Sequence, residues 1–289
     1  MSFNQGSSQP IQPLSIGNVV TAGLRLYGSH LKSYLKLGFI ACAWILVPVY
    51  GWARCGATFA LISRLAYSEL VEQPETEQEA GRFVRARLWQ FLVMALLMLL
   101  LIISITIGVT ILLFIFTLIV GTILRIIVPS LNANDVFNPI AILISFALLL
   151  GYMGIIFTTF LLVQARFIVI EVPLAIENYI DGASTIGRSW YLTSGNMWRI
   201  SAILITTGLI IIALLLPINV LNIITQSFLQ PFLRADTNYR LLGVLINVVL
   251  ILVRIAIVVP FLQTIKAVLY CDLRSRREGF GLKLRNRNI

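Results

Sequence analysis

The sequence predicts an all-α fold: a polytopic integral membrane helical bundle with about six transmembrane helices plus two amphipathic helices on the cytoplasmic side. Of the 289 residues, 58% are hydrophobic and only 12% are charged, whereas soluble domains carry about 25% charged residues. The run Leu88 to Leu124 holds thirty-seven residues without a charged side chain, and about 20 apolar residues suffice to cross a bilayer core as a helix. Lys and Arg are also distributed unevenly between the loops.

The chain is expected to begin with a disordered tail, 1–13, followed by an amphipathic helix over 14–36. Apolar and basic side chains fall on opposite faces of this helix, and Ser15 is the expected N-cap. We expect the helix to lie at the membrane interface with Lys and Arg toward the lipid headgroups. The alternative is a helix packed under the bundle in contact with protein. No signal-peptide pattern precedes it, so the first span is expected to direct insertion.

A hydrophobic hairpin comes next, with a first span over about 37–49 and a return segment over about 52–70. Arg54 and Arg64 make the return segment a poor span, because charged side chains are costly inside a bilayer. Two interpretations stay open. The segment crosses with its arginines reaching opposite surfaces, or it is half of a re-entrant hairpin.

The long run from Leu88 is the wrong length for one straight crossing. As a single helix extended to Val128 it would measure about 60 Å, twice the ~30 Å hydrocarbon core. The charges of the flanking loops allow only one crossing. We therefore expect a span up to about Gly108 and a kinked, tilted or folded remainder, with Gly108 and Gly121 as break points.

Three further spans are predicted over about 140–164, 200–220 and 241–265. A second amphipathic interfacial segment, 172–198, separates the first two of these, and Gly195 is its expected C-terminal stop.

The sequence thus predicts a single membrane domain over 14–272, followed by a basic cytoplasmic tail over 273–289. With both termini cytoplasmic, seventeen of the twenty-two Lys and Arg residues lie on the cytoplasmic side and four lie outside. This bias agrees with the positive-inside rule. A seventh crossing within 88–128 would place the basic tail outside, and we reject it. The net charge of +10 is explained by these loops and does not indicate nucleic acid.

Motifs for catalysis or cofactor binding do not stand out. There is no Walker motif, G-x-S-x-G, H-E-x-x-H or dinucleotide fingerprint. The scattered Cys42, Cys55 and Cys271 indicate neither zinc nor structural disulfides. The single histidine, His30, has no partner carboxylate near it in the sequence and is expected to face lipid headgroups. The sequence therefore predicts no cofactor, no metal and no catalytic residue.

Charged residues near the spans suggest two kinds of site. Glu177 and Asp181 are four residues apart, and we expect them to form structural ion pairs with Arg188 or Arg199. Arg254 lies deep in the last span, where a charge is a candidate intramembrane polar site; a carbonyl, water or lipid phosphate is its expected partner. The candidate contacts to lipid headgroups or a partner protein are Arg25, Lys32, Lys36, Arg188, Trp190, Trp198, Arg199, Arg274, Arg276 and Arg277.

Three stretches resemble one bacterial membrane-protein family. The amino-terminal helix reads PLSIGNVVTAGLRLYGSHLK, the mid-chain segment from Asp181 reads DGASTIGRSWYLTSGNMWR, and the tail from Tyr270 reads YCDLRSRREGFGLKL. Together they are similar to the multi-span family named for the membrane domain of some glycerophosphodiester phosphodiesterases. The resemblance implies a stand-alone member in the bacterial inner (plasma) membrane, with another internal bacterial membrane as the alternative. The catalytic domain of such enzymes needs several histidines and metal-binding carboxylates, so their activity is not expected of this chain.

Two function classes follow. In the first, the protein is a non-catalytic scaffold or accessory subunit that binds partner proteins or anionic lipids at its basic cytoplasmic face. In the second, it is transporter-like or handles a lipid between its helices near Arg254. A polar cavity around Arg254 would favour the second class, and a dry bundle would favour the first.

Overall fold

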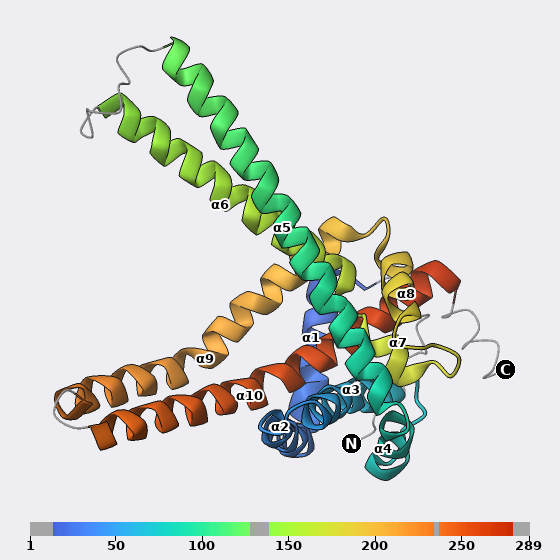
Figure 1. Ribbon diagram of the computed structural model, residues 1–289. Coiled ribbons are helices and arrows are strands. Elements are labelled where there is room, and N and C mark those ends of the chain that lie inside the picture. The colour runs from blue at the N-terminus through green and yellow to red at the C-terminus, as the bar shows by residue number, and fades with distance from the viewer. Residues whose placement is uncertain (1–13, 128–138, 234–236, 280–289) are drawn as a thin grey trace, which may run out of the picture. The chain divides into compact units, whose positions relative to one another are not determined.

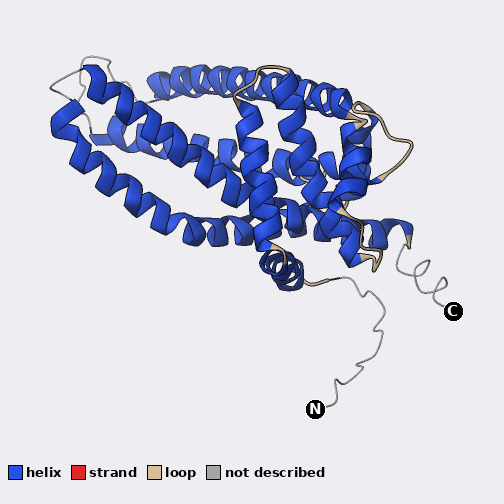
Figure 2. Cartoon of the chain, turned by 90° about the horizontal axis from the view of Figure 1, so that it is seen from below, coloured by secondary structure: helices blue, strands red, loops and turns tan. Residues whose placement is uncertain are grey.

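The computed structural model describes residues 14–127, 139–233 and 237–279. Within these ranges the regular elements are all helices, joined by loops and turns (Figure 2). They are α1 (Ile16–Ser29), α2 (Leu31–Ile45), α3 (Tyr50–Leu70), α4 (Glu77–Arg85), α5 (Leu88–Ile127), α6 (Pro139–Phe167), α7 (Glu171–Ile176), α8 (Ser184–Thr193), α9 (Met197–Leu233) and α10 (Thr237–Glu278). The predicted all-α class is confirmed.

Four stretches of helix are long and apolar enough to cross a membrane, as expected of a membrane protein. They are Leu88–Ile123, Ile142–Ile176, Met197–Phe228 and Leu242–Glu278. Each overlaps one of the last four spans predicted from the sequence and extends beyond it at the C-terminal end. The predicted count of six is not confirmed. α2 has only 15 residues, which gives about 22 Å of helix, and α3 carries Arg54 and Arg64.

The chain divides into two compact units, more finely than the single domain expected over 14–272. One unit is Ala95–Gln164, and the other combines Met1–Met94 with Ala165–Ile289. In the smaller unit, the described parts of α5 and α6 contact each other through the hydroxyls of Thr117 and Tyr152. Between these helices lies a cavity of about 210 Å³ with mainly apolar walls.

In the larger unit α10 is the central helix, and α1, α2, α3 and α9 pack along it (Figure 1). Glycine permits the close approach of α2. A Cβ added at Gly38 would lie 2.5 Å from the carbonyl oxygen of Ala256 and 2.9 Å from Pro260. Pro260 lies inside α10 and has no N–H, so the carbonyl of Ala256 lacks its usual helical donor. The backbone of α2 therefore crosses α10 at an irregular turn.

The first amphipathic segment forms two helices instead of the single helix expected over 14–36. Ser15 caps α1 by accepting from the N–H of Asn18, as predicted, and the chain bends at His30 before α2 begins. The physical reason lies in packing: Val19 and Val20 of α1 are buried in the larger unit, where α1 packs against α9 and α10. The apolar face of α1 is thus covered by protein, which favours the alternative placement under the bundle.

The second amphipathic segment is also divided. α7 ends at Ile176, and the backbone of the following residue, Glu177, is extended. α8 begins only after a turn in which the N–H of Ser184 donates to the carboxylate of Asp181 at 2.8 Å. Gly195 adopts a positive φ of 79° after α8, so the predicted C-terminal stop is confirmed. The expected tail from residue 273 is helical as far as Glu278.

α5 is one continuous helix over Leu88–Ile127, so the predicted breaks at Gly108 and Gly121 are wrong. A glycine inside a helix costs only about 1 kcal/mol. An interrupted helix in a membrane would leave backbone N–H and C=O groups without partners, and each such group costs several kcal/mol. The continuous helix is therefore more stable than an interrupted one.

Candidate functional site

In the larger unit, the end of α10 is joined to the start of α9 and to the residues before α1 by buried ion pairs and hydrogen bonds, beginning with Asp272 of α10. Its carboxylate is 1% exposed and accepts from Arg199 at 2.7 Å, from Arg276 at 3.0 Å and from the N–H of Leu14 at 2.8 Å. Arg199 and Arg276 also both donate to the carbonyl of Leu14. One carboxylate thus connects the start of α1 with α9 and α10.

A second cluster centres on Glu177 and Glu278. Arg188 of α8 lies 2.9 Å from Glu177 and 2.5 Å from Glu278, and the hydroxyl of Tyr270 donates to Glu177. Arg274 donates to Glu278 at 2.9 Å. Burial alone would lower the pKa of Arg188, but its hydrogen bonds with the two carboxylates and their charges outweigh burial and leave that pKa raised. The predicted pair of Glu177 and Arg188 is confirmed.

Deeper in the unit, a smaller group surrounds Glu171 at the start of α7. Its carboxylate accepts from Lys266 and from the side-chain amide of Gln263 at 2.8 Å. The hydroxyl of Ser63 in turn donates to the side-chain oxygen of Gln263. Gln263 and Lys266 thus join Tyr270 and Arg274 of the second cluster in a polar row along α10 that faces α3, α7 and α8.

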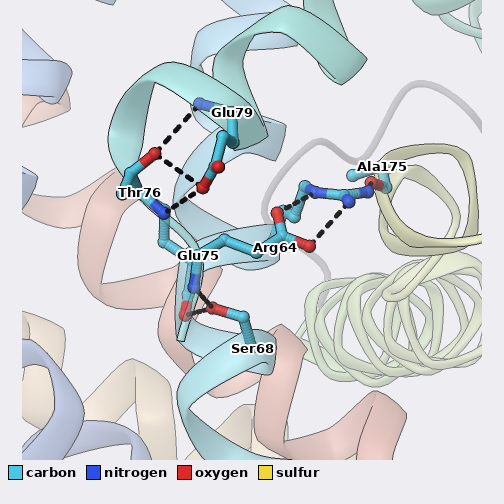
Figure 3. Close-up of polar contacts among 7 residues, drawn as sticks. Arg64, Ser68, Glu75, Thr76, Glu79 and Ala175 are labelled. Atoms are coloured by element: carbon cyan, nitrogen blue, oxygen red, sulfur yellow. Dashed lines mark hydrogen bonds and ion pairs between the residues drawn. The ribbon is translucent and has the colours of Figure 1, made fainter. Parts of the chain in front are cut away.

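Two arginines hold the C-terminal end of α7. Arg64 forms two hydrogen bonds with Glu75, at 2.6 and 2.7 Å, and donates to the carbonyl of Ala175 at 2.7 Å (Figure 3). Arg87 donates to the carbonyls of Leu174, Glu177 and Asn178. Cations at a helix C-terminus satisfy its free carbonyls and oppose its dipole. These arginines are therefore structural.

The structure places the predicted headgroup contacts in two groups. Arg188, Arg199, Arg274 and Arg276 are used within the protein, as described above, and Arg277 donates to the carbonyl of Ser194. The others lie at the surface: Arg25 and Lys32 are exposed, Lys36 lies 3.6 Å from Glu77, Trp190 is 52% exposed and Trp198 is 79% exposed. The side chains of the second group lie largely at the surface, where an external partner could contact them.

One acidic residue, Asp181, and one basic residue, His30, make contacts that differ from those predicted. Asp181 pairs with neither Arg188 nor Arg199; it caps α8, and the hydrogen bonds with Ser184 lower its pKa. His30 does have a carboxylate partner, since its Nε2 lies 2.9 Å from Glu69. Sequence spacing could not show this contact, because it joins the junction of α1 and α2 to the C-terminal end of α3, with all of α2 in between.

Arg254, the predicted intramembrane site, lies in α10 with its Nε buried and without a hydrogen-bond partner among the described residues. Arg54 and Arg166 share this property. Arg166 stacks on Trp190, with its guanidinium carbon 4.2 Å from the ring centre. The hydrogen bonds from α10 to Glu171 and Glu177 begin at Gln263, nine positions beyond Arg254. Arg254 takes no part in them.

A groove between α2, α3 and α4 is a feature that the sequence did not indicate. Its volume is about 180 Å³, and its walls include Leu37, Leu61 and Val84 beside Arg54 and Arg85. One part of the groove could have been predicted from the sequence, because Arg54 follows the aromatic residues of a hairpin tip. The residues that complete the groove come from α4, which no pattern in the sequence linked to α2.

In the described part of the chain, no group of three or more His, Cys, Asp or Glu residues could hold a metal ion. No family model, curated protein or solved structure matches the chain. The resemblance to the phosphodiesterase membrane-domain family therefore stays a prediction.

Proposed function

We propose that this chain is a non-catalytic integral membrane protein that acts as a scaffold or accessory subunit. The observation that carries the proposal is that most carboxylates in the described ranges are held in ion pairs or helix caps within the protein. Seven carboxylates in the described ranges lie in ion pairs, and Glu79 and Asp181 cap helices. A general base needs a carboxylate free to exchange protons, and such a group is scarce here. The residues left for an external partner are the exposed basic and aromatic ones of α1, α2, α8 and α9.

We further propose a bacterial inner-membrane location with both termini cytoplasmic. In this topology α5, α6, α9 and α10 cross the membrane, and the α2–α3 hairpin enters and returns on the cytoplasmic side. The polar helix α4 supports this, because its Glu77 and Arg85 line the same groove as Arg54 near the hairpin tip. The six-crossing arrangement has the same parity and is the alternative.

Cysteine labelling distinguishes the parts of this topology. In a background with the three native cysteines replaced by serine, Asn134→Cys and Asn238→Cys should react with an impermeant maleimide from outside. Val47→Cys at the hairpin tip should react only after the membrane is permeabilised, or not at all. Labelling of Val47→Cys from outside would establish six crossings, and labelling of Asn134→Cys only from the cytoplasm would overturn the orientation.

The scaffold role is tested through the exposed basic surface. The protein would be purified in mild detergent and its complexes weighed by native mass spectrometry. Wild type should carry one partner protein at fixed stoichiometry, and the double variant Arg25→Glu, Lys32→Glu should lose it. The control Arg82→Glu, on an exposed face of α4, should retain it. A wild-type chain that purifies alone would overturn the proposal.

A lipid-handling role near Arg254 is the second candidate, and the buried, unpartnered Nε of Arg254 favours it. Here Arg254→Leu should change membrane lipid composition while the protein level stays normal. If growth, lipid composition and protein level all stay unchanged, Arg254 has no such role.

A further inference from the structure

The groove between α2, α3 and α4 combines an apolar wall with unbalanced positive charge. Leu37, Leu61 and Val84 contribute to the wall, while Arg54, Arg85 and Glu77 supply the charges. Glu77 has its own cation outside these two, since Lys36 lies 3.6 Å away. The groove thus holds two guanidinium groups against one carboxylate that is already paired.

Arg54 is held in place by aromatic rings. Its guanidinium carbon lies 4.7 Å from the ring centre of Trp44 and 5.8 Å from that of Tyr50. Its Nε is buried and has no hydrogen-bond partner in the described chain. A buried charged donor without an acceptor is costly, and the aromatic faces fix its position without supplying that acceptor. The rings therefore fix the guanidinium of Arg54 in the wall of the groove, where its positive charge favours an anion.

Arg85 provides the second charge. Its Nε donates to the carbonyl of Gly81 at 2.9 Å, which anchors the side chain on α4, and its residue is exposed. Glu77 also lines the groove and would repel a ligand anion placed beside it. The anion is therefore favoured at the Arg54 end.

The hairpin tip beside Arg54 identifies the source of the anion. Leu46 is 69% exposed and Trp52 is 55% exposed, and large exposed apolar patches of this kind mark membrane or protein contact. Tryptophan favours the headgroup level of a bilayer. We infer that the groove binds one anionic phospholipid, with its phosphate on Arg54 and the start of an acyl chain along Leu37 and Leu61. This site does not depend on the scaffold role.

The test uses the full chain in detergent after delipidation, titrated with phosphatidylglycerol and followed by native mass spectrometry. Arg54→Gln should weaken the first bound phosphatidylglycerol at least about tenfold, because it removes a charge-assisted hydrogen bond, and Arg54→Lys should lie between. The matched control Arg82→Gln, at an exposed position of α4 that does not line the groove, should bind like wild type. Phosphatidylcholine should bind more weakly than phosphatidylglycerol, and inorganic phosphate should not compete.

A second variant guards against a folding defect in Arg54→Gln. Ile40 lines the groove and is exposed at its edge, so Ile40→Trp should fill the groove without disturbing the core. It should weaken phosphatidylglycerol binding while the melting temperature stays at the wild-type value. The inference is overturned if Ile40→Trp and Arg54→Gln bind phosphatidylglycerol like wild type, or if inorganic phosphate displaces the lipid, since the site would then be one for a soluble anion.

Discussion

Arg199 at the start of α9 and Asp272 near the end of α10 lie 2.7 Å apart in an ion pair whose carboxylate is 1% exposed. The same carboxylate accepts the N–H of Leu14, so three segments distant in sequence meet at one side chain. A buried pair adds little to stability relative to apolar residues, but removing one partner is costly because the other charge stays buried. Asp272 therefore fixes which helix ends belong together.

The first prediction concerns this carboxylate. Asp272→Asn should lower the free energy of unfolding by roughly 3–5 kcal/mol, because Arg199 and Arg276 would lose the negative charge that pairs with them while remaining partly buried, and only one side-chain oxygen would be left to accept. Thermal melting in detergent measures the effect. Glu72→Gln is the matched control, since Glu72 is exposed. Equal melting of Asp272→Asn and wild type would show that the pair is not structural.

The second prediction concerns the crossing of α2 and α10. Gly38→Ala should destabilise the protein by about 1–3 kcal/mol, because the new Cβ would lie 2.5 Å from the carbonyl oxygen of Ala256 and overpacking costs that much. Gly28→Ala is the control: nothing lies within 4 Å of an added Cβ there, so it should be neutral or stabilising by up to about 1 kcal/mol. A neutral Gly38→Ala would mean that the helices cross elsewhere.

The contrast between these positions explains how far the fold could be predicted. The membrane class, the Ser15 cap and the Gly195 stop were predictable, because each depends on residues within a few positions of one another. The crossing at Gly38 was not, because it depends on Pro260, more than two hundred positions away. The bend at His30 has the same origin, since burial of Val19 and Val20 against distant helices outweighs the periodicity that favoured one helix.

The third prediction concerns the end of α7. Arg87→Ala should free the carbonyls of Leu174, Glu177 and Asn178 and speed amide hydrogen exchange in the segment after α7. Arg87→Lys should give an intermediate rate, because an ammonium group keeps the charge but not the planar set of donors. The comparison is made by mass spectrometry of peptic peptides, with exchange in α4 as internal reference. Unchanged exchange after α7 in Arg87→Ala would refute the capping role.

The candidate site shows the same division between local and distant information. The pairs Arg274 with Glu278 and Asp272 with Arg276 are four residues apart on one helix, a spacing that could have been recognised in the sequence. The prediction of headgroup contacts for these arginines misses this pairing, because the positive-inside rule does not say which cations are already neutralised inside the protein. The partners Arg199 and Arg188 come from other helices and required the fold.

The last prediction concerns the continuity of α5. Spin labels at Leu96 and Ile119, both exposed, are separated by 23 residues, which gives about 35 Å along a straight helix. A right-angle turn at Gly108 would shorten this separation to about 25 Å. Double electron–electron resonance in nanodiscs should therefore give the longer distance. Gly108→Ala should leave that distance unchanged, because nothing lies within 4 Å of an added Cβ. Since about 35 Å already exceeds a ~30 Å hydrocarbon core, the longer distance would also require α5 to tilt in the bilayer or extend beyond it.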